Sequence, residues 1–238
     1  RWSLIASVRG ADAPAARAAL EELCALTWYP LYAYARRRGL SGDDARDATQ
    51  GFFAEFLACA GFARAERERG RLRSFLLGSF QNFLGKRAAE NDSEKRGGAH
   101  ATLSLDLGTA EERYAIEPAH ELSPERLYAA AWARALLAAV VAELGAEYEA
   151  RGQGELFHAL EGELGGDATP HAELAARLAS SPGAVKVAAH RLRARYRELL
   201  RRSILETLTD PAEFEDELGA LLAAVSSAAP GTDPPESR

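Results

Sequence analysis

The side chains best suited to chemistry in this chain are cationic, and they gather between residues 184 and 202. This window holds seven Lys or Arg residues and one acid, Glu198. The five histidines show no metal-ligand spacing, and the chain has neither a glycine-rich phosphate loop nor a nucleophile elbow. Because like charges repel one another along a helix, a polyanionic partner explains the window better than solvation does. We therefore expect a nucleic-acid-binding protein that is not an enzyme and has no metal site or cofactor.

Two short helices between residues 169 and 202 would position these cations. Thr169 and Pro170 suit the N-cap and first position of one helix, and Ser181 followed by a proline starts the next. The sequence SSPG at 180–183 breaks the pattern between them. A slim helix, a tight turn and a basic second helix predict a helix-turn-helix whose second helix can enter a DNA major groove. The alternative is a helical hairpin with a solvated basic face.

The second of these helices is expected to have one buried and one exposed side. Its apolar residues recur at helical spacing and form one stripe: Val185, Ala189, Leu192, Tyr196 and Leu199. Its cationic and histidine side chains lie off that stripe and face outward: Lys186, His190, Arg191, Arg193 and Arg197.

The net charge of −6 conceals an uneven distribution of charge. Residues 64–96 hold nine basic and five acidic side chains, and 184–202 hold seven and one. Residues 103–163 hold four basic and twelve acidic side chains, and 206–238 hold one and eight. Because salt screens charge over roughly 8–10 Å, contact with phosphate depends on the local charge and not on the total. Both basic regions are therefore candidate DNA-binding surfaces.

The composition predicts an all-α fold. Alanine-rich, periodic segments punctuated by proline favour helices, and no strand pattern is evident. Cys24 and Cys59 fit small core residues in a reducing compartment better than a disulfide. We find no leader pattern and no eighteen-residue apolar stretch, so we expect a cytoplasmic protein without membrane insertion.

The order of helical and irregular segments predicts two small helical domains and a C-terminal extension. The N-terminal domain would contain four helices, at 13–25, 28–38, 41–60 and 71–89. The parts are a four-helix domain at 1–96, an irregular linker at 97–122, a helix-turn-helix domain at 123–205, and an acidic helix with a disordered tail at 206–238.

The order and spacing of four motifs resemble the extracytoplasmic-function (ECF) group of bacterial RNA polymerase sigma factors, in the sigma-70 family. The resemblance covers roughly residues 2–202. The motifs are LYAYARR at 31–37, DARDATQGFF at 44–53, LRSFLL at 72–77 with Asn82, and GAVKVAAHR at 183–191. Arg46, Gly51 and Phe75 depart from the usual family pattern, which has acids at or near the first two positions and tryptophan at the third.

The resemblance implies a sigma factor that directs core RNA polymerase to promoters for transcription initiation, with no chemistry of its own. The third predicted helix would bind the clamp coiled coil of the polymerase, and its candidate residues are Asp44, Asp47, Gln50 and Phe53. The fourth helix and the loop before it would hold melted −10 DNA, and the candidates there are Arg69, Arg71, Arg73, Gln81, Asn82, Lys86 and Arg87. The recognition helix would bind the −35 element through Ser181, Lys186, Val187, His190, Arg191 and Arg193.

The resemblance also implies further partners. The far end of the recognition helix would meet DNA phosphate or the polymerase flap. The linker would run toward the active-site cleft, with Glu111, Glu112 and Glu117 resembling the charge of nucleic acid. The regulator stays open between an anti-sigma factor, a kinase and the acidic extension at 206–238, which can fold back on the basic recognition helix and mask it, or bind a regulator.

Two other functions fit parts of the sequence. One is a dimeric helix-turn-helix repressor or activator that binds a palindromic duplex operator, which leaves the aromatic and basic N-terminal half unexplained. The other is a helical adaptor of a sigma/anti-sigma system that does not bind DNA. Removal of Lys186 and Arg191 separates these cases, because it disables a sigma factor and leaves the adaptor unchanged.

Overall fold

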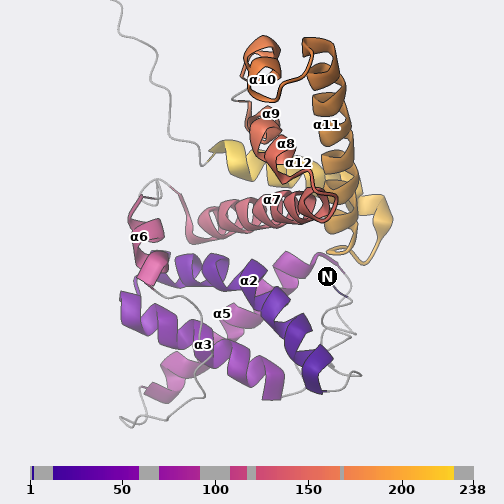
Figure 1. The fold of residues 1–238 in the computed structure, drawn as a ribbon. Coiled ribbons are helices and arrows are strands. Elements are labelled where there is room, and N and C mark those ends of the chain that lie inside the picture. The colour runs from indigo at the N-terminus through magenta and orange to yellow at the C-terminus, as the bar shows by residue number, and fades with distance from the viewer. Residues whose placement is uncertain are drawn as a thin grey trace, which may run out of the picture. The chain divides into compact units, whose positions relative to one another are not determined.

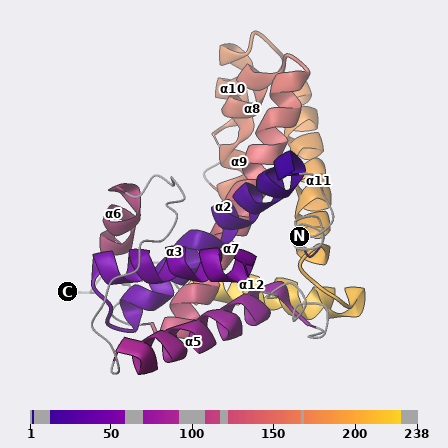
Figure 2. The same ribbon diagram turned by 90° about the horizontal axis from the view of Figure 1, so that it is seen from below.

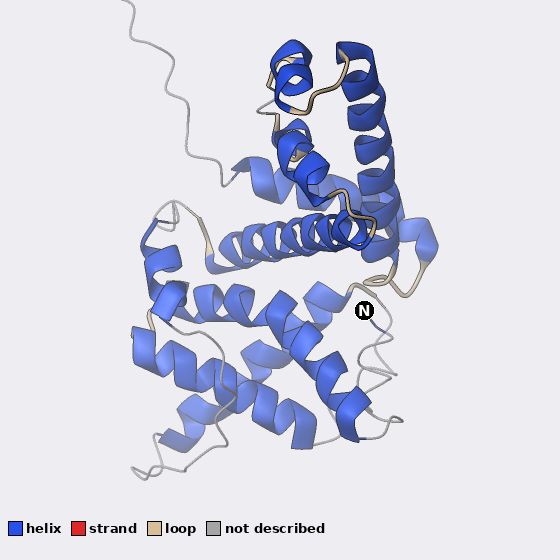
Figure 3. Ribbon diagram, viewed as in Figure 1, coloured by secondary structure: helices blue, strands red, loops and turns tan. Residues whose placement is uncertain are grey.

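The computed structural model describes Trp2 and residues 13–58, 70–91, 108–116, 122–166 and 169–227. In these ranges the regular elements are helices, and the only strand-like pairing is an isolated bridge between Arg71 and Leu208 (Figure 3). The predicted all-α class is confirmed for this part of the chain. The structure forms two compact units, unit 1 with residues 1–135 and 205–238, and unit 2 with residues 136–204.

Unit 1 has an aromatic core between its helices. Its largest fully buried side chains include Tyr32, Tyr34, Phe53, Phe80 and Trp132. Such rings bury a large apolar area each, so they dominate the stability of a small helical unit. The elements are α2 (Ala13–Arg37), α3 (Gly42–Ala58), α5 (Leu72–Asn91), α6 (Gly108–Ile116), the first part of α7 (Pro124–Ala150), the 3-10 turn η1 (Pro211–Glu213) and α12 (Phe214–Ser227) (Figure 1).

α2 is one helix where the sequence predicted two, at 13–25 and 28–38. Pro30 lies inside it, although proline removes one helical hydrogen bond. The buried side chains of Leu26, Trp28 and Tyr29 continue across the predicted break. The apolar packing of this segment keeps the helix continuous, and the prediction of a break there is wrong.

The predicted irregular linker contains a helix, α6. Arg36 donates to both carboxylate oxygens of Glu111, at 3.1 and 2.7 Å, and Tyr32 donates a further hydrogen bond to it. The guanidinium of Arg113 lies 3.8 Å from the centre of the Tyr29 ring. These contacts with α2 explain a nine-residue helix that its own sequence pattern does not predict.

The C-terminal segment belongs to unit 1, so the boundaries of the compact units differ from the predicted domain boundaries. Leu72 N donates to the Thr207 carbonyl at 2.9 Å, and Trp2 Nε1 donates to the same carbonyl at 3.0 Å. Asp210 caps η1 by accepting from the Ala212 amide at 2.9 Å, with Pro211 at the first position of the turn. The first part of α7 likewise groups with unit 1 rather than with the helix-turn-helix.

α7 corrects the prediction about apolar stretches. By length and composition it could cross a membrane, although half of its most apolar window is buried and a core helix passes the same test. Leu127, Trp132 and Leu136 are fully buried, as are Val140 and Leu144 further along. The helix is thus a core element in each of the two units to which it contributes.

Unit 2 is a small helical unit around the second part of α7. Gly145 lets α8 approach closely, because a Cβ at this position would lie 3.0 Å from the Phe157 ring. Leu144, Leu160 and Leu192 are among its fully buried core residues. The elements are residues 136–150 of α7, α8 (Gly154–Leu160), α9 (Gly162–Gly165), α10 (His171–Arg177) and α11 (Pro182–Leu205) (Figure 1).

Candidate nucleic-acid interface

Backbone hydrogen bonds close the turn between α10 and α11. Ser180 N donates to the Ala175 carbonyl at 2.9 Å, and Ala179 N donates to the Ala176 carbonyl at 3.4 Å. This is the Schellman arrangement of a helix C-terminus. Ala179 has a left-handed φ of 46°, a conformation that favours glycine. The predicted tight turn is present, and it carries backbone strain at one alanine.

The two helix starts differ in how well the sequence predicted them. α11 begins as expected, since the Ser181 hydroxyl accepts from the Ala184 amide at 3.2 Å. α10 begins at His171, with Pro170 at the N-cap and no side-chain cap hydrogen bond. The predicted N-cap role of Thr169 is therefore wrong.

α11 has the buried stripe and the exposed face that its sequence predicts. Val185, Ala189, Leu192 and Leu199 are buried, and Tyr196 is half-buried. The candidate −35 residues on the exposed face are Ser181, Lys186, Val187, His190 and Arg191. The structure brings these five together over the first three turns of the helix.

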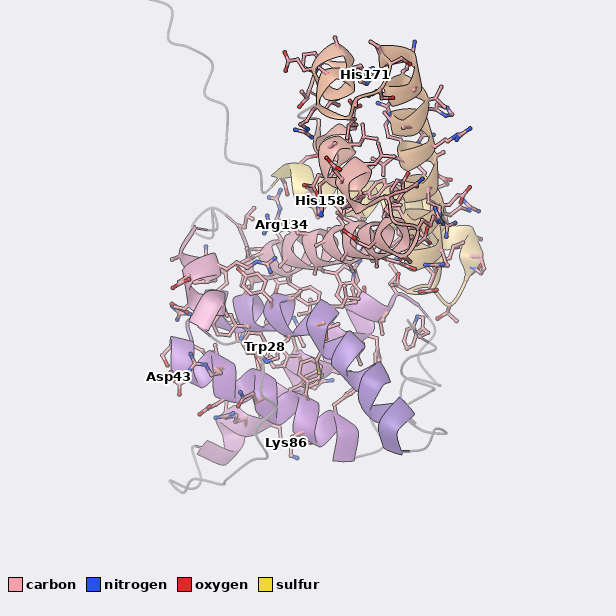
Figure 4. All side chains as sticks on the ribbon, viewed as in Figure 1. Trp28, Asp43, Lys86, Arg134, His158 and His171 are labelled. Carbon is pink, nitrogen blue, oxygen red and sulfur yellow. The ribbon has the colours of Figure 1, made fainter. Side chains whose placement is uncertain are left out.

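Arg193 lies apart from this exposed group. Its guanidinium donates to Glu163 at 3.1 Å, and the other Glu163 oxygen lies 3.1 Å from His171 Nε2 at the start of α10 (Figure 4). The Glu163 side chain is only 4% exposed. Arg193 therefore links α11 to α9, and this role is structural.

Acids from α7 neutralise part of the cationic helix. Arg195 donates to both Glu147 oxygens, at 2.9 and 2.5 Å, and Arg202 pairs with Glu143. The Arg195 hydrogen bonds lower the pKa of Glu147, and the Glu147 hydrogen bonds raise the pKa of Arg195. The charge count over 184–202 thus overstated the free positive charge of the helix. Lys186 and Arg191 near the turn, and Arg197 further along, remain exposed to an outside anion.

A shallow hollow of about 400 Å³ lies beside the exposed group. Val187 is 50% exposed at its rim, an apolar side chain among cations. A branched apolar side chain there has the chemistry to contact a thymine methyl group in a major groove. The lining residues are Tyr148, Gln153, Leu156, Gly183, Ala184, Val187, Ala188 and Arg191.

On α3, the candidate polymerase contacts separate into surface and core. Asp44 and Asp47 are exposed and Gln50 is half-buried, whereas Phe53 is fully buried. The Asp44 amide donates to the Ser41 hydroxyl at 3.1 Å, which caps the helix as predicted. Phe53 is a core residue, so its predicted contact with a partner is not supported by the geometry.

On α5, the candidate −10 residues differ in their surroundings. Gln81 donates to the Tyr34 hydroxyl at 2.9 Å, and Asn82 is exposed. Lys86 projects from the helix and pairs with Glu55 at 3.3 Å (Figure 4). Arg87 and Gln81 help to line a hollow of about 460 Å³. Arg69 lies outside the described residues.

Arg71 and Arg73, at the start of α5, contact the C-terminal helix instead of open solvent. Arg73 donates to both Glu217 oxygens, at 2.6 and 2.9 Å, and Arg71 Nε lies 3.2 Å from both Glu213 and Glu217. The ribbons of the two helices, α5 and α12, are seen in Figure 2. Burial lowers the pKa of Arg73, but the hydrogen bonds and charge of Glu217 outweigh it and leave the pKa raised. Sequence reasoning missed this network, because 144 residues separate Arg73 from Glu217.

Sequence reasoning also missed the cluster of Tyr32, Arg36 and Glu111. The Tyr32 hydroxyl and the Arg36 hydrogen bonds lower the pKa of Glu111. Burial, followed by Glu111, raises the pKa of Tyr32 to about 12. In this structure Glu111 is engaged in holding α6, while Glu112 is exposed and Glu117 lies outside the described residues.

No known protein family, curated protein or solved structure matches this chain. Within the described residues there is also no cluster of three or more potential metal ligands.

Proposed function

We propose that this chain is a sigma factor: an initiation subunit that recruits core RNA polymerase, binds duplex DNA at −35 and holds the melted strand at −10. The observation that carries the proposal is the exposed face of α11. Lys186, His190 and Arg191 are exposed there, on the side of α11 opposite its buried stripe. They lie at the N-terminal end of the second helix of a helix-turn-helix. This is the end of a recognition helix that contacts base edges.

A second basic region supports this function over a simple repressor. Asn82 and Lys86 lie on the exposed side of α5 in unit 1, separate from the helix-turn-helix of unit 2. Cationic and polar side chains are among the groups that bind single-stranded DNA, and Lys86 and Asn82 supply them on α5. The aromatic side chains of α5 are buried or half-buried and pack in the core. A dimeric operator-binding protein requires no such surface.

The proposed organisation is a −10 and core-binding domain, a linker and a −35 domain, with α3 as the surface for the polymerase clamp. Asp47 and Gln50 lie three residues apart on α3 and on one side of it, where arginines or amides of a partner can pair with them. The protein would act in the cytoplasm, without a cofactor and without chemistry of its own.

The test is reconstitution with purified core RNA polymerase on a library of promoter fragments. Stable core binding with promoter-dependent run-off transcripts is the expected result. Tight binding of duplex DNA without core binding would indicate a repressor instead of a sigma factor. Core binding by the wild-type chain that yields no promoter-dependent transcripts, together with no binding of DNA, would indicate the adaptor.

A further inference from the structure

The contact between α12 and the start of α5 is built around a buried carboxylate. The Glu217 side chain is 1% exposed, and those of its partners Arg73 and Arg71 are 17% and 27% exposed. Glu217 meets the planar guanidinium of Arg73 with both oxygens. Removing such charges from water is costly unless each is fully paired, so the network is a specific feature of this helix.

The backbone before α12 is fixed to the same place. Arg71 and Leu208 form an antiparallel bridge, and Thr209 Oγ1 both accepts from the Gly70 amide at 3.1 Å and donates to the Gly70 carbonyl at 2.9 Å. Phe214 and Leu221 of the acidic segment are buried. Residues 206–221 thus cover the start of α5, and two of their acids, Glu213 and Glu217, pair with the arginines there.

A carboxylate and a phosphate offer a guanidinium the same bidentate pair of oxygens. Arg71 and Arg73 therefore form an anion site that is occupied by a group of the protein itself. Packing alone does not require a carboxylate at position 217, because an apolar side chain of similar volume commonly stabilises a core as well as a buried ion pair does. An internal anion that is held at a candidate DNA site suggests competition with DNA.

We infer that α12 is an autoinhibitory cap in which Glu217, assisted by Glu213, occupies the phosphate-binding site formed by Arg71 and Arg73. This inference rests on the proposed function, because that function assigns single-stranded promoter DNA to the site. Backbone phosphates of the melted strand replace the two carboxylates, and α12 leaves α5 when they do. The sequence had suggested masking of the recognition helix; the contacts instead point to masking of the −10 surface.

The test compares full-length Glu217→Gln with wild type for binding of a fluorescein-labelled oligothymidylate by anisotropy at low salt. The expected result is an affinity gain of at least about tenfold, together with faster amide hydrogen exchange in α12. The gain should disappear in the double variant that also carries Arg73→Gln. The matched control is Glu143→Gln, which removes one acid from an Arg pair in unit 2.

Three results would overturn the cap. They are unchanged affinity in folded Glu217→Gln, an equal gain in Glu143→Gln, and DNA binding by wild type without faster exchange in α12. If Glu217→Gln fails to fold, Glu213→Gln decides the matter, because Glu213 is 40% exposed and its replacement leaves the buried Glu217 paired with both arginines. Unchanged affinity in folded Glu213→Gln also contradicts the cap. Core binding and transcription by wild type are measured separately, so a failed cap and a failed sigma function give different patterns.

Discussion

Single residues in the turn between α10 and α11 fix the position of the candidate recognition helix. The turn depends on Ala179 in a left-handed conformation, while the Ser181 cap fixes the first turn of α11. Ala179 is not a candidate DNA contact, and Ser181 has this structural role besides its proposed contact with phosphate. Both set the position of Lys186 and Arg191 relative to α10, so changes here should alter stability before they alter the charge that an anion encounters.

Ala179→Gly should stabilise unit 2. An alanine in the left-handed conformation costs roughly 1–2 kcal/mol relative to a glycine there. Part of this gain is cancelled, because glycine loses more conformational entropy on folding than alanine does. We expect a gain of about 1 kcal/mol, seen as about fivefold slower hydrogen exchange of α10 amides. Hydrogen exchange is the suitable probe because all three tryptophans, Trp2, Trp28 and Trp132, belong to unit 1.

The control for this prediction is the same chemical change within α10. Ala176→Gly lies at an exposed helical position, where glycine should cost about 0.5–1 kcal/mol and speed exchange. Slower exchange in both variants, or no slowing in Ala179→Gly, would show that the left-handed strain is not stored at this turn.

A second residue-scale prediction concerns the pair of Glu147 and Arg195. Glu147→Gln should cost about 1 kcal/mol at neutral pH, measured as faster exchange of α11 amides. The folded pKa of Glu147 is lowered from an ordinary value of 4.5, so the contribution is complete above that value and is lost as pH falls through the lowered pKa. The difference between variant and wild type should therefore shrink in acid. An equal difference at all pH values, or an equal effect of Glu155→Gln on the exposed side of α8, would contradict this.

At the scale of elements, the periodicity of apolar residues predicted buried helix faces better than breaker residues predicted helix ends. The buried stripe of α11 follows from its own spacing, and the structure confirms it. The sequence predicted a break between residues 25 and 28, yet the packing of Leu26, Trp28 and Tyr29 keeps α2 continuous. α6 could not be predicted, because its main partner, Arg36, lies 75 residues before Glu111. The pairing of Arg73 with Glu217 escaped for the same reason, since no local pattern encodes a contact between distant segments.

The surface of α3 provides an element-scale prediction. The double variant Asp47→Ala/Gln50→Ala should reduce affinity for core polymerase by at least about tenfold, because it removes two polar groups from one side of the helix. Surface plasmon resonance with immobilised core enzyme measures this. The matched control is Asp43→Asn, since Asp43 pairs with Arg46 of its own helix at 3.0 Å. Unchanged binding in the double variant would remove α3 from the proposed interface.

At the scale of the whole molecule, charge is organised by tertiary pairing as much as by sequence. The basic windows around α5 and α11 lose several arginines to acids from α7, α9 and α12. Beside these pairs, the first turns of α11 keep Lys186 and Arg191 exposed, so the charge of this face stays locally positive. This also reconciles a net charge of −6 with a proposed role on DNA.

The most direct test of the sigma-factor account is run-off transcription by reconstituted holoenzyme with wild-type chain and with Lys186→Ala/Arg191→Ala. The template is a promoter selected by the wild-type holoenzyme, and the control is Arg126→Ala at an exposed position of α7. The account predicts that the double variant still binds core polymerase but loses at least about 90% of −35-dependent transcript, consistent with two contacts of roughly 1–3 kcal/mol each. Full transcription by the double variant, or none by wild type bound to core, would contradict it.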